Sequence, residues 1–184
     1  MNIKKIAPIF MIPVIVLAMT GIAYAMWSET LKVNVTVNTG EVDVEWSDWY
    51  CSDTGADPQA EGFYNEEGKD VATCDIDIEK TDDEGDVIKL AVTLDNTYPG
   101  YSVDVTLVVD NIGTIPVKLY SHSFSGLEGL PLDVSLTIPE DTQIDPGGNA
   151  TYILHITVLQ GAEENATYSF ELTLVFAQWN EVGG

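Results

Sequence analysis

The 184-residue chain contains no arginine and only seven lysines, against 30 aspartate and glutamate residues, so its formal net charge is −23. A protein that binds nucleic acid displaces counterions from phosphates with cationic side chains, and this chain has very few of them. We therefore expect no nucleic-acid partner. Hydrophobic residues make up 45% of the chain, so its acidity does not indicate disorder.

Motifs of the common catalytic centres are also missing from the sequence. The only two histidines, His122 and His155, are 33 residues apart, and no His-Glu-x-x-His motif is present. A catalytic zinc ion normally needs three protein ligands, often including histidines. The sequence also lacks a G-x-S-x-G turn and a phosphate-binding glycine loop. We therefore expect that the protein is not an enzyme and that it requires no cofactor.

Cysteine is scarce as well, with one pair, Cys51 and Cys74. An isolated pair in an exported chain most simply forms one disulfide, because no further cysteine or histidine that could complete a metal site lies nearby in the sequence. Residues 51–74 are rich in acids and turn-forming residues. The sequence thus predicts an acidic excursion of the chain whose two ends are joined by a disulfide.

The first 25 residues have the organisation of a secretory signal peptide. Lys4 and Lys5 precede an uncharged apolar stretch, residues 6–25, which ends in the small-x-small pattern of Ala23 and Ala25 before Met26. Cleavage there by a signal peptidase predicts an extracellular or cell-surface protein that meets the membrane only transiently. The alternative is a retained anchor, because twenty apolar residues are just long enough to span a bilayer.

A strand pattern follows the leader almost immediately, within residues 26–39. Apolar residues alternate with polar ones, and Asn38, Thr39 and Gly40 then mark a turn. Alternation with a period of two predicts a strand with one apolar face. The side chains on that face are Leu31, Val33, Val35 and Val37.

Residues 40–184 contain eight further strand patterns and no helical periodicity. Short alternating segments separated by turn residues predict an all-β fold, an antiparallel sandwich of the jelly-roll or immunoglobulin-like type with about nine strands. The expected positions are residues 41–50, 75–80, 87–96, 101–111, 112–121, 132–138, 150–160 and 167–179. In the strongest patterns we expect Tyr101, Val103, Val105, Leu107, Val109, Tyr152, Leu154, Ile156 and Val158 to point inward.

Two kinds of modification or ligand site are suggested by local sequence. Calcium prefers oxygen ligands clustered on turns, and residues 82–86 form the densest group of acids, although they do not match an EF-hand loop. Three N-x-S/T sequons, at Asn34, Asn149 and Asn165, are candidates for glycosylation in an exported chain. The weak calcium candidates are Asp53, Asp57, Asp82, Asp83, Glu84 and Asp86.

The run AYAMWSETL with VNTGEVDV, which includes Trp27, resembles the start of the TasA/camelysin group of exported β-sandwich proteins processed by a SipW-type signal peptidase. Residues 96–119 and 144–179 are similar to archaeal members of this group, the bundling-pilus and cannula subunits. The resemblance implies donor-strand assembly, in which the N-terminal strand of one subunit fills a groove in the next. It also raises the expectation of calcium, which cannula-type subunits use in assembly.

The sequence and the resemblance together predict a structural subunit of an extracellular filament or tubule, for example in a biofilm matrix. The signal peptide would be residues 1–25, the donor strand 26–39 and the sandwich 40–184. In the simplest alternative for the segment, the strand pairs within its own domain. An alternative function is a monomeric, calcium-dependent adhesion module anchored by residues 6–25. The metalloprotease label that camelysin carries finds no support in these residues.

Overall fold

The computed structural model describes residues 7–23, 29–53, 55–57 and 68–182. The chain divides into two compact units, Met1–Asn38 and Thr39–Gly184. Lys4, Lys5 and the predicted cleavage residues Ala25 and Met26 lie outside the described residues, as does Trp27.

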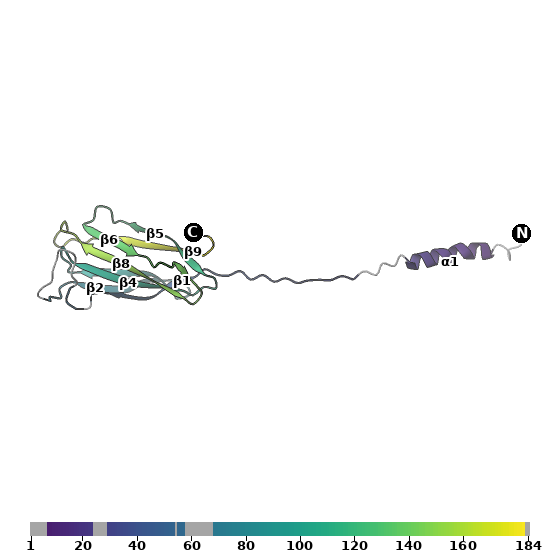
Figure 1. Ribbon diagram of the computed structural model, residues 1–184, viewed down its shortest axis with the longest axis horizontal. Helices are drawn as coiled ribbons and strands as arrows, with labels where there is room; N and C mark the ends of the chain where they lie inside the picture. Colours follow the sequence, from purple (N-terminus) through teal and green to yellow (C-terminus); the bar gives the residue numbers. More distant parts are fainter. Residues whose placement is uncertain (1–6, 24–28, 54, 58–67, 183–184) are drawn as a thin grey trace. The chain divides into compact units, whose positions relative to one another are not determined.

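The first unit contains the helix α1, Ala7–Ala23, and an extended segment after it (Figure 1). The helix consists of apolar and small residues with Pro13 inside it. No helix in the described parts of the chain combines the length and apolar character needed for a membrane crossing. Residues 29–43 are assigned to neither helix nor strand. The strand predicted over residues 31–37 is therefore not formed here, since a strand needs a hydrogen-bonded neighbour.

The second unit is built on a four-stranded antiparallel sheet. It is formed by β1 (Val44–Cys51), β4 (Ser102–Asn111), β8 (Asn149–Val158) and β6 (Leu132–Thr137), in that order across the sheet. Opposite residues along β4 and β8 run from Ser102 and Thr157 at one end to Asp110 and Asn149 at the other. These two central strands carry the most buried side chains of the domain.

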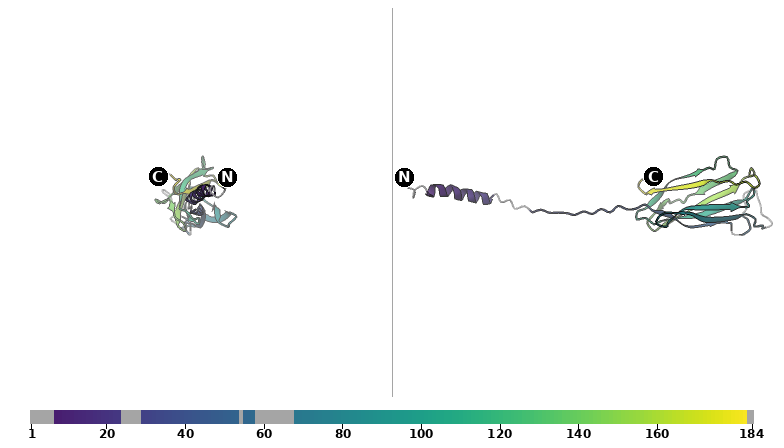
Figure 2. Two further views of the ribbon diagram at one scale, coloured as in Figure 1. Left: turned by 90° about the vertical axis from the view of Figure 1, so that its right-hand side faces the viewer. Right: turned by 180° about the vertical axis from the view of Figure 1, so that it is seen from behind.

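The second layer of the sandwich consists of two separate antiparallel sheets. One is the pair β2 (Thr73–Thr81) and β3 (Val87–Asp95). The other has the order β7 (Gln143–Ile144), β5 (Val117–Ser125) and β9 (Glu171–Gln178). Figure 1 shows β5 and β9 toward the β6 side of the four-stranded sheet and β2 toward its β4 and β1 side. Figure 2 shows the strands from behind, again running along the length of the domain.

The predicted inward faces of the two central strands are confirmed. Tyr101 and Tyr152 are fully buried, and the alternate residues that follow them along β4 and β8 are no more than 5% exposed. Half-buried apolar side chains of the two smaller sheets pack against this cluster. The all-β antiparallel sandwich predicted from alternation is therefore the fold of the domain, and the predicted disulfide between Cys51 and Cys74 is formed.

The sequence reading was wrong in its details around the fifth strand. The strand predicted for residues 112–121 begins only at Val117, and β7 falls within a stretch expected to be a turn. Residues 111–116 turn around the buried side chain of Asn111 instead. Its amide donates to the carbonyl oxygens of Ile115 (2.9 Å) and Ile144 (2.8 Å), and its Oδ1 accepts from the backbone N–H of Gly113 (3.0 Å).

Tyr152 gives a test of the core. Its ring packs against Phe176, but its buried hydroxyl has no hydrogen-bond partner among the described residues. We expect Tyr152→Phe to raise the free energy of unfolding by about 1 kcal/mol at neutral pH, because it removes an unsatisfied polar group and keeps the ring. Chemical denaturation measures this change, and Tyr120→Phe on the exposed surface should have no effect.

The same residue predicts alkaline sensitivity. Burial raises the pKa of Tyr152 from 10.0 to about 12. The folded state therefore binds the proton of the Tyr152 hydroxyl more tightly than the unfolded state does. The contribution of this proton to the free energy of unfolding is complete below pH 10 and is lost as the pH rises through 12. We expect the stability advantage of Tyr152→Phe to grow over this range in denaturation measured at several pH values. An advantage that stays constant would contradict the assignment.

Candidate functional site

The segment that the sequence marks as a donor strand is extended, and its apolar side chains are exposed. Val35 and Val37 are 76% and 78% exposed, and Leu31 and Val33 are 88% and 84% exposed. Scattered apolar residues are normal on a surface, but four at alternate positions form one continuous apolar edge. This segment therefore has the side-chain pattern of a strand without a neighbouring strand to complete it.

The chain immediately after this segment is fixed to the turn that Asn111 organises. The backbone N–H of Glu41 donates to Thr114 Oγ1 (2.8 Å), and Thr114 N–H donates to the Glu41 carbonyl oxygen (3.0 Å). Gly113 N–H donates to the Asp43 carbonyl oxygen (3.2 Å). A Cβ atom on Gly113 would lie only 2.6 Å from the Glu41 oxygen, so the close approach requires glycine there. Residues 40–43 thus hold the root of the segment against the domain.

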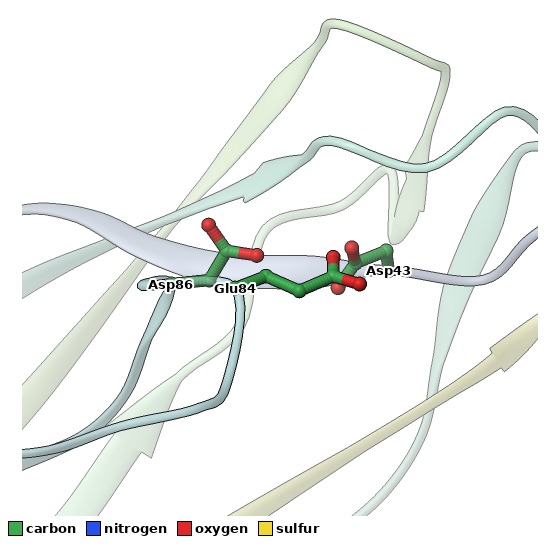
Figure 3. A group of neighbouring side chains, drawn as sticks. All are labelled: Asp43, Glu84 and Asp86. Carbon is green, nitrogen blue, oxygen red and sulfur yellow. The ribbon is translucent and has the colours of Figure 1, made fainter.

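One acidic cluster lies at this root and joins Asp43 to the β2–β3 turn. Carboxylate oxygens of Asp43, Glu84 and Asp86 lie within 4.8 Å of one another. In Figure 3 the Glu84 side chain extends toward Asp43, with the Asp86 carboxylate beside it. Desolvation, followed by repulsion from Asp82 and Asp43, raises the pKa of Asp86. A pocket of about 460 Å³ nearby is lined by residues 41–43 and 80–84.

Two of the predicted calcium ligands in the β2–β3 turn do not join this cluster. Asp82 Oδ1 accepts three backbone hydrogen bonds, from the N–H groups of Glu84, Gly85 and Asp86, at 2.9–3.0 Å. These bonds, led by that from Asp86, lower the pKa of Asp82, so the carboxylate shapes the turn. Asp83 belongs to neither group of converging carboxylates among the described residues.

A second acidic cluster lies beside the disulfide and includes the predicted Asp53 and Asp57 together with Asp70. Asp57 is only 4% exposed, and its Oδ1 accepts from the N–H groups of Val71 (2.9 Å) and Ala72 (3.2 Å). Oxygen donors of this kind suit a hard cation such as Ca²⁺. Asp43 and Asp70 were not identified as possible ligands from the sequence, because each is distant in sequence from the other carboxylates of its cluster.

Two tyrosines lie against the second cluster. The Tyr101 hydroxyl donates to Asp53 Oδ2 at 2.7 Å, and the rings of Tyr98 and Tyr101 meet edge to face at 5.9 Å. Burial, followed by the hydrogen bond with Asp57, raises the pKa of Tyr98 to about 12. Burial raises the pKa of Tyr101 further, with the Asp53 hydrogen bond as the next cause. Both phenols therefore stay protonated and act as donors to the carboxylates.

The outer face of the four-stranded sheet holds a contact that sequence reasoning missed. His155 Nδ1 lies 2.6 Å from Asp104 Oδ1, and its Nε2 lies 2.8 Å from Thr137 Oγ1. Asp104 and Ser135 lie opposite His155 on the two neighbouring strands. The register of the three strands therefore brings His155 close to its two hydrogen-bond partners. The side chains of His155 and Asp104 are 37% and 50% exposed. Open to solvent on the face of a sheet, this group has the geometry of a cross-strand bridge.

The other sequence candidates are dispersed over the domain. His122 is on β5 and His155 is on β8, so the two histidines belong to different sheets. The ring of His122 packs against that of Phe124. Asn34, Asn149 and Asn165 are all exposed, which an acceptor of a glycan requires. Asn165 also has a positive φ of 57°, in the loop before β9.

No protein-family model, curated protein or solved structure matches the chain.

Asp57 is the carboxylate whose removal should matter most for the fold. We expect Asp57→Ala to lower the free energy of unfolding by about 2 kcal/mol, because it leaves the N–H groups of Val71 and the buried Ala72 without their acceptor. Asp57→Asn keeps an oxygen acceptor and should lose less. Asp70→Ala, at an exposed position, is the matched control and should change stability by under about 0.5 kcal/mol. Equal losses at both positions in thermal unfolding would contradict this role.

Proposed function

We propose that the protein is an exported structural subunit that assembles head-to-tail into an extracellular filament or tubule by donor-strand complementation. The observation that carries this proposal is the extended segment 31–37, whose four alternating apolar side chains are exposed. The leader pattern of residues 1–25 and the resemblance to exported sandwich subunits support it further. The partner is a second copy of the same chain.

Elementary energetics favour such an exchange. The backbone N–H and C=O groups of a single strand have no hydrogen-bond partners on a neighbouring strand. The outermost strand of an open sheet has unpaired N–H and C=O groups of the same kind along its free edge. Adding the strand to the edge satisfies both and buries alternate side chains, as in β-augmentation. Burying Leu31, Val33, Val35 and Val37 would contribute roughly 6–12 kcal/mol before ordering costs.

The covalent arrangement decides the form of the assembly. Segment and sandwich belong to one chain, and residues 40–43 fix the root of the segment by hydrogen bonds. Each subunit therefore donates its segment to one neighbour and accepts the segment of another neighbour. Such a contact is heterologous, so it propagates from subunit to subunit. The net charge of −23 opposes association of free subunits, so salt or divalent cations should favour assembly.

A second candidate is supported by the carboxylate cluster of Asp53, Asp57 and Asp70. Converging oxygen ligands beside a disulfide suit a calcium-dependent, monomeric adhesion module held at the membrane by residues 6–25. This module and the fibre subunit differ in the mature N-terminus. The fibre subunit should begin at Met26 after export, whereas the anchored module should keep the leader, and mass spectrometry of the exported protein distinguishes them.

The donor role is tested by charges placed on opposite faces of the segment. We expect Val33→Asp with Val35→Asp to raise the concentration needed for assembly about 100-fold or more, because two buried valines are lost. Asn34→Asp with Thr36→Asp adds the same charge to the polar face and is the matched control. Electron microscopy and sedimentation of the exported chain measure the assemblies. Equal assembly of the two variants would overturn the proposal.

A further inference from the structure

We infer that the acceptor for residues 31–37 of a second copy is the slot between β3 and β9 in the second layer of the sandwich. This inference rests on the proposed function and adds the place where the partner binds. Several edges lack a strand neighbour among the described residues: those of β1, β6, β7, β2, β3 and β9. The choice among them follows from what a seven-residue strand with one apolar face requires.

The first requirement is a backbone partner on each side of the incoming strand. Successive N–H and C=O groups of a strand point alternately to its two sides, so a strand at an outer edge of the sandwich has half of its groups unpaired. Among the strands that the structure describes, β3 is hydrogen-bonded to β2 alone and β9 to β5 alone in the second layer. A strand between β3 and β9 would have a ladder partner on both sides and would join the two smaller sheets into one.

The second requirement is sufficient length and a tolerant edge. β7 has only two residues, whereas β3 has nine and β9 has eight. β2 carries acidic residues at alternate positions, Asp75, Asp77 and Glu79, which discourage pairing at that outer edge. The slot between β3 and β9 matches a segment of seven residues and avoids this row of acids.

One side-chain contact joins the two edges of the slot in the free subunit. Lys89 on β3 lies 2.9 Å from Glu79 on β2 and 3.8 Å from Glu171 on β9, so its ammonium group links the two sheets. All three side chains are about half exposed, and such ion pairs are weak. Lys89 therefore brings the edges together without preventing their separation.

The burial of the inner faces indicates that the slot is closed in the free subunit. The inward apolar residues of β4 and β8 are at most 8% exposed, although no strand among the described residues joins β3 to β9 above them. The inward residues of β3 and β9 pack against that core and remain half-buried: Leu90, Val92, Leu94, Leu172, Leu174 and Phe176. Insertion of a partner's strand must therefore separate β3 from β9 and release Lys89 from Glu171.

The charge of the donor segment suits this position. Lys32 is the only cation between residues 29 and 68, and it lies on the polar face of the segment. When the apolar face turns to the core, Lys32 turns outward with Lys89, toward the side of the layer where Glu79 and Glu171 lie. A neighbour's Lys32 can then take over the carboxylate that Lys89 gives up.

A cross-link across the slot tests the inference directly. In the exported full chain, Lys89→Cys with Glu171→Cys places two thiols at the edges, and Cys51 and Cys74 stay in their disulfide. A short bismaleimide then ties β3 to β9 before assembly. We expect the linked subunit to lose the ability to form fibres that the same double variant shows without the reagent, so that the unlinked variant is the reference for the effect of the cross-link.

The linked subunit should still donate its own segment. Mixed with unmodified chain, it should cap growing ends and shorten the fibres in proportion to its share. The matched control is Asp133→Cys with Thr157→Cys, an opposite pair on the already bonded strands β6 and β8, whose cross-link should leave assembly unchanged. Normal fibres from subunits linked across the slot would overturn the inference.

Hydrogen exchange separates failure of this inference from failure of the proposed function. On assembly of the unmodified chain, backbone amides of β3 and β9 should gain protection, and those at the edges of β1 and β6 should not. Protection at β1 or β6 would overturn the slot and leave donor-strand assembly in place. Unchanged assembly of the Val33→Asp with Val35→Asp variant would instead overturn the proposed function, and with it this inference.

Discussion

The domain depends on the buried amide of Asn111 at the end of β4. This side chain is fully buried and uses both donors of its amide nitrogen and its carbonyl oxygen, on three different backbone groups. It therefore satisfies polar groups that would otherwise be costly inside the sandwich, and it joins β4, the turn before β5 and the short strand β7. The same turn receives the backbone of residues 40–43. One amide thus connects the core to the root of the N-terminal segment.

Most of the fold was predictable from alternation alone. The apolar residues predicted to face inward on β4 and β8 are buried, and the one departure is Thr106, which lies on the other face of β4 and is buried as well. What alternation did not reveal was set by hydrogen bonds between distant residues. β7 consists of two residues, and it forms only because they pair with Val117 and Lys118, which are distant in sequence. β5 begins late because the residues before it turn around Asn111, whose amide donates to the Ile115 carbonyl oxygen. The division of the second layer into two sheets also has no signature in local sequence.

The candidate site was predictable to the extent that it is local in the chain. The alternating apolar side chains of residues 31–37, which are exposed in the structure, could be identified because their pattern is contained in a few consecutive residues. The acidic clusters were only half recognised: Glu84 with Asp86, and Asp53 with Asp57, are near neighbours in sequence, but Asp43 and Asp70 join them through the fold. Likewise, the contact of His155 with Asp104 and Thr137 requires the register of three strands. Asp82, a calcium candidate from the sequence, accepts backbone hydrogen bonds within its turn, and a carboxylate that stabilises a turn has the same local sequence pattern as one that could bind a cation.

The disulfide has a mechanical consequence for a chain that is pulled from its N-terminus. Tension on residues 40–43 passes into β1, whose hydrogen bonds to β4 lie across the strand direction and are loaded together in shear. At the last residue of β1, Cys51 transfers the remaining tension covalently to Cys74 and the β2–β3 pair. The acidic excursion between the two cysteines is bypassed, so it cannot unravel and lengthen the subunit. A stretched subunit would therefore resist as a short, stiff link.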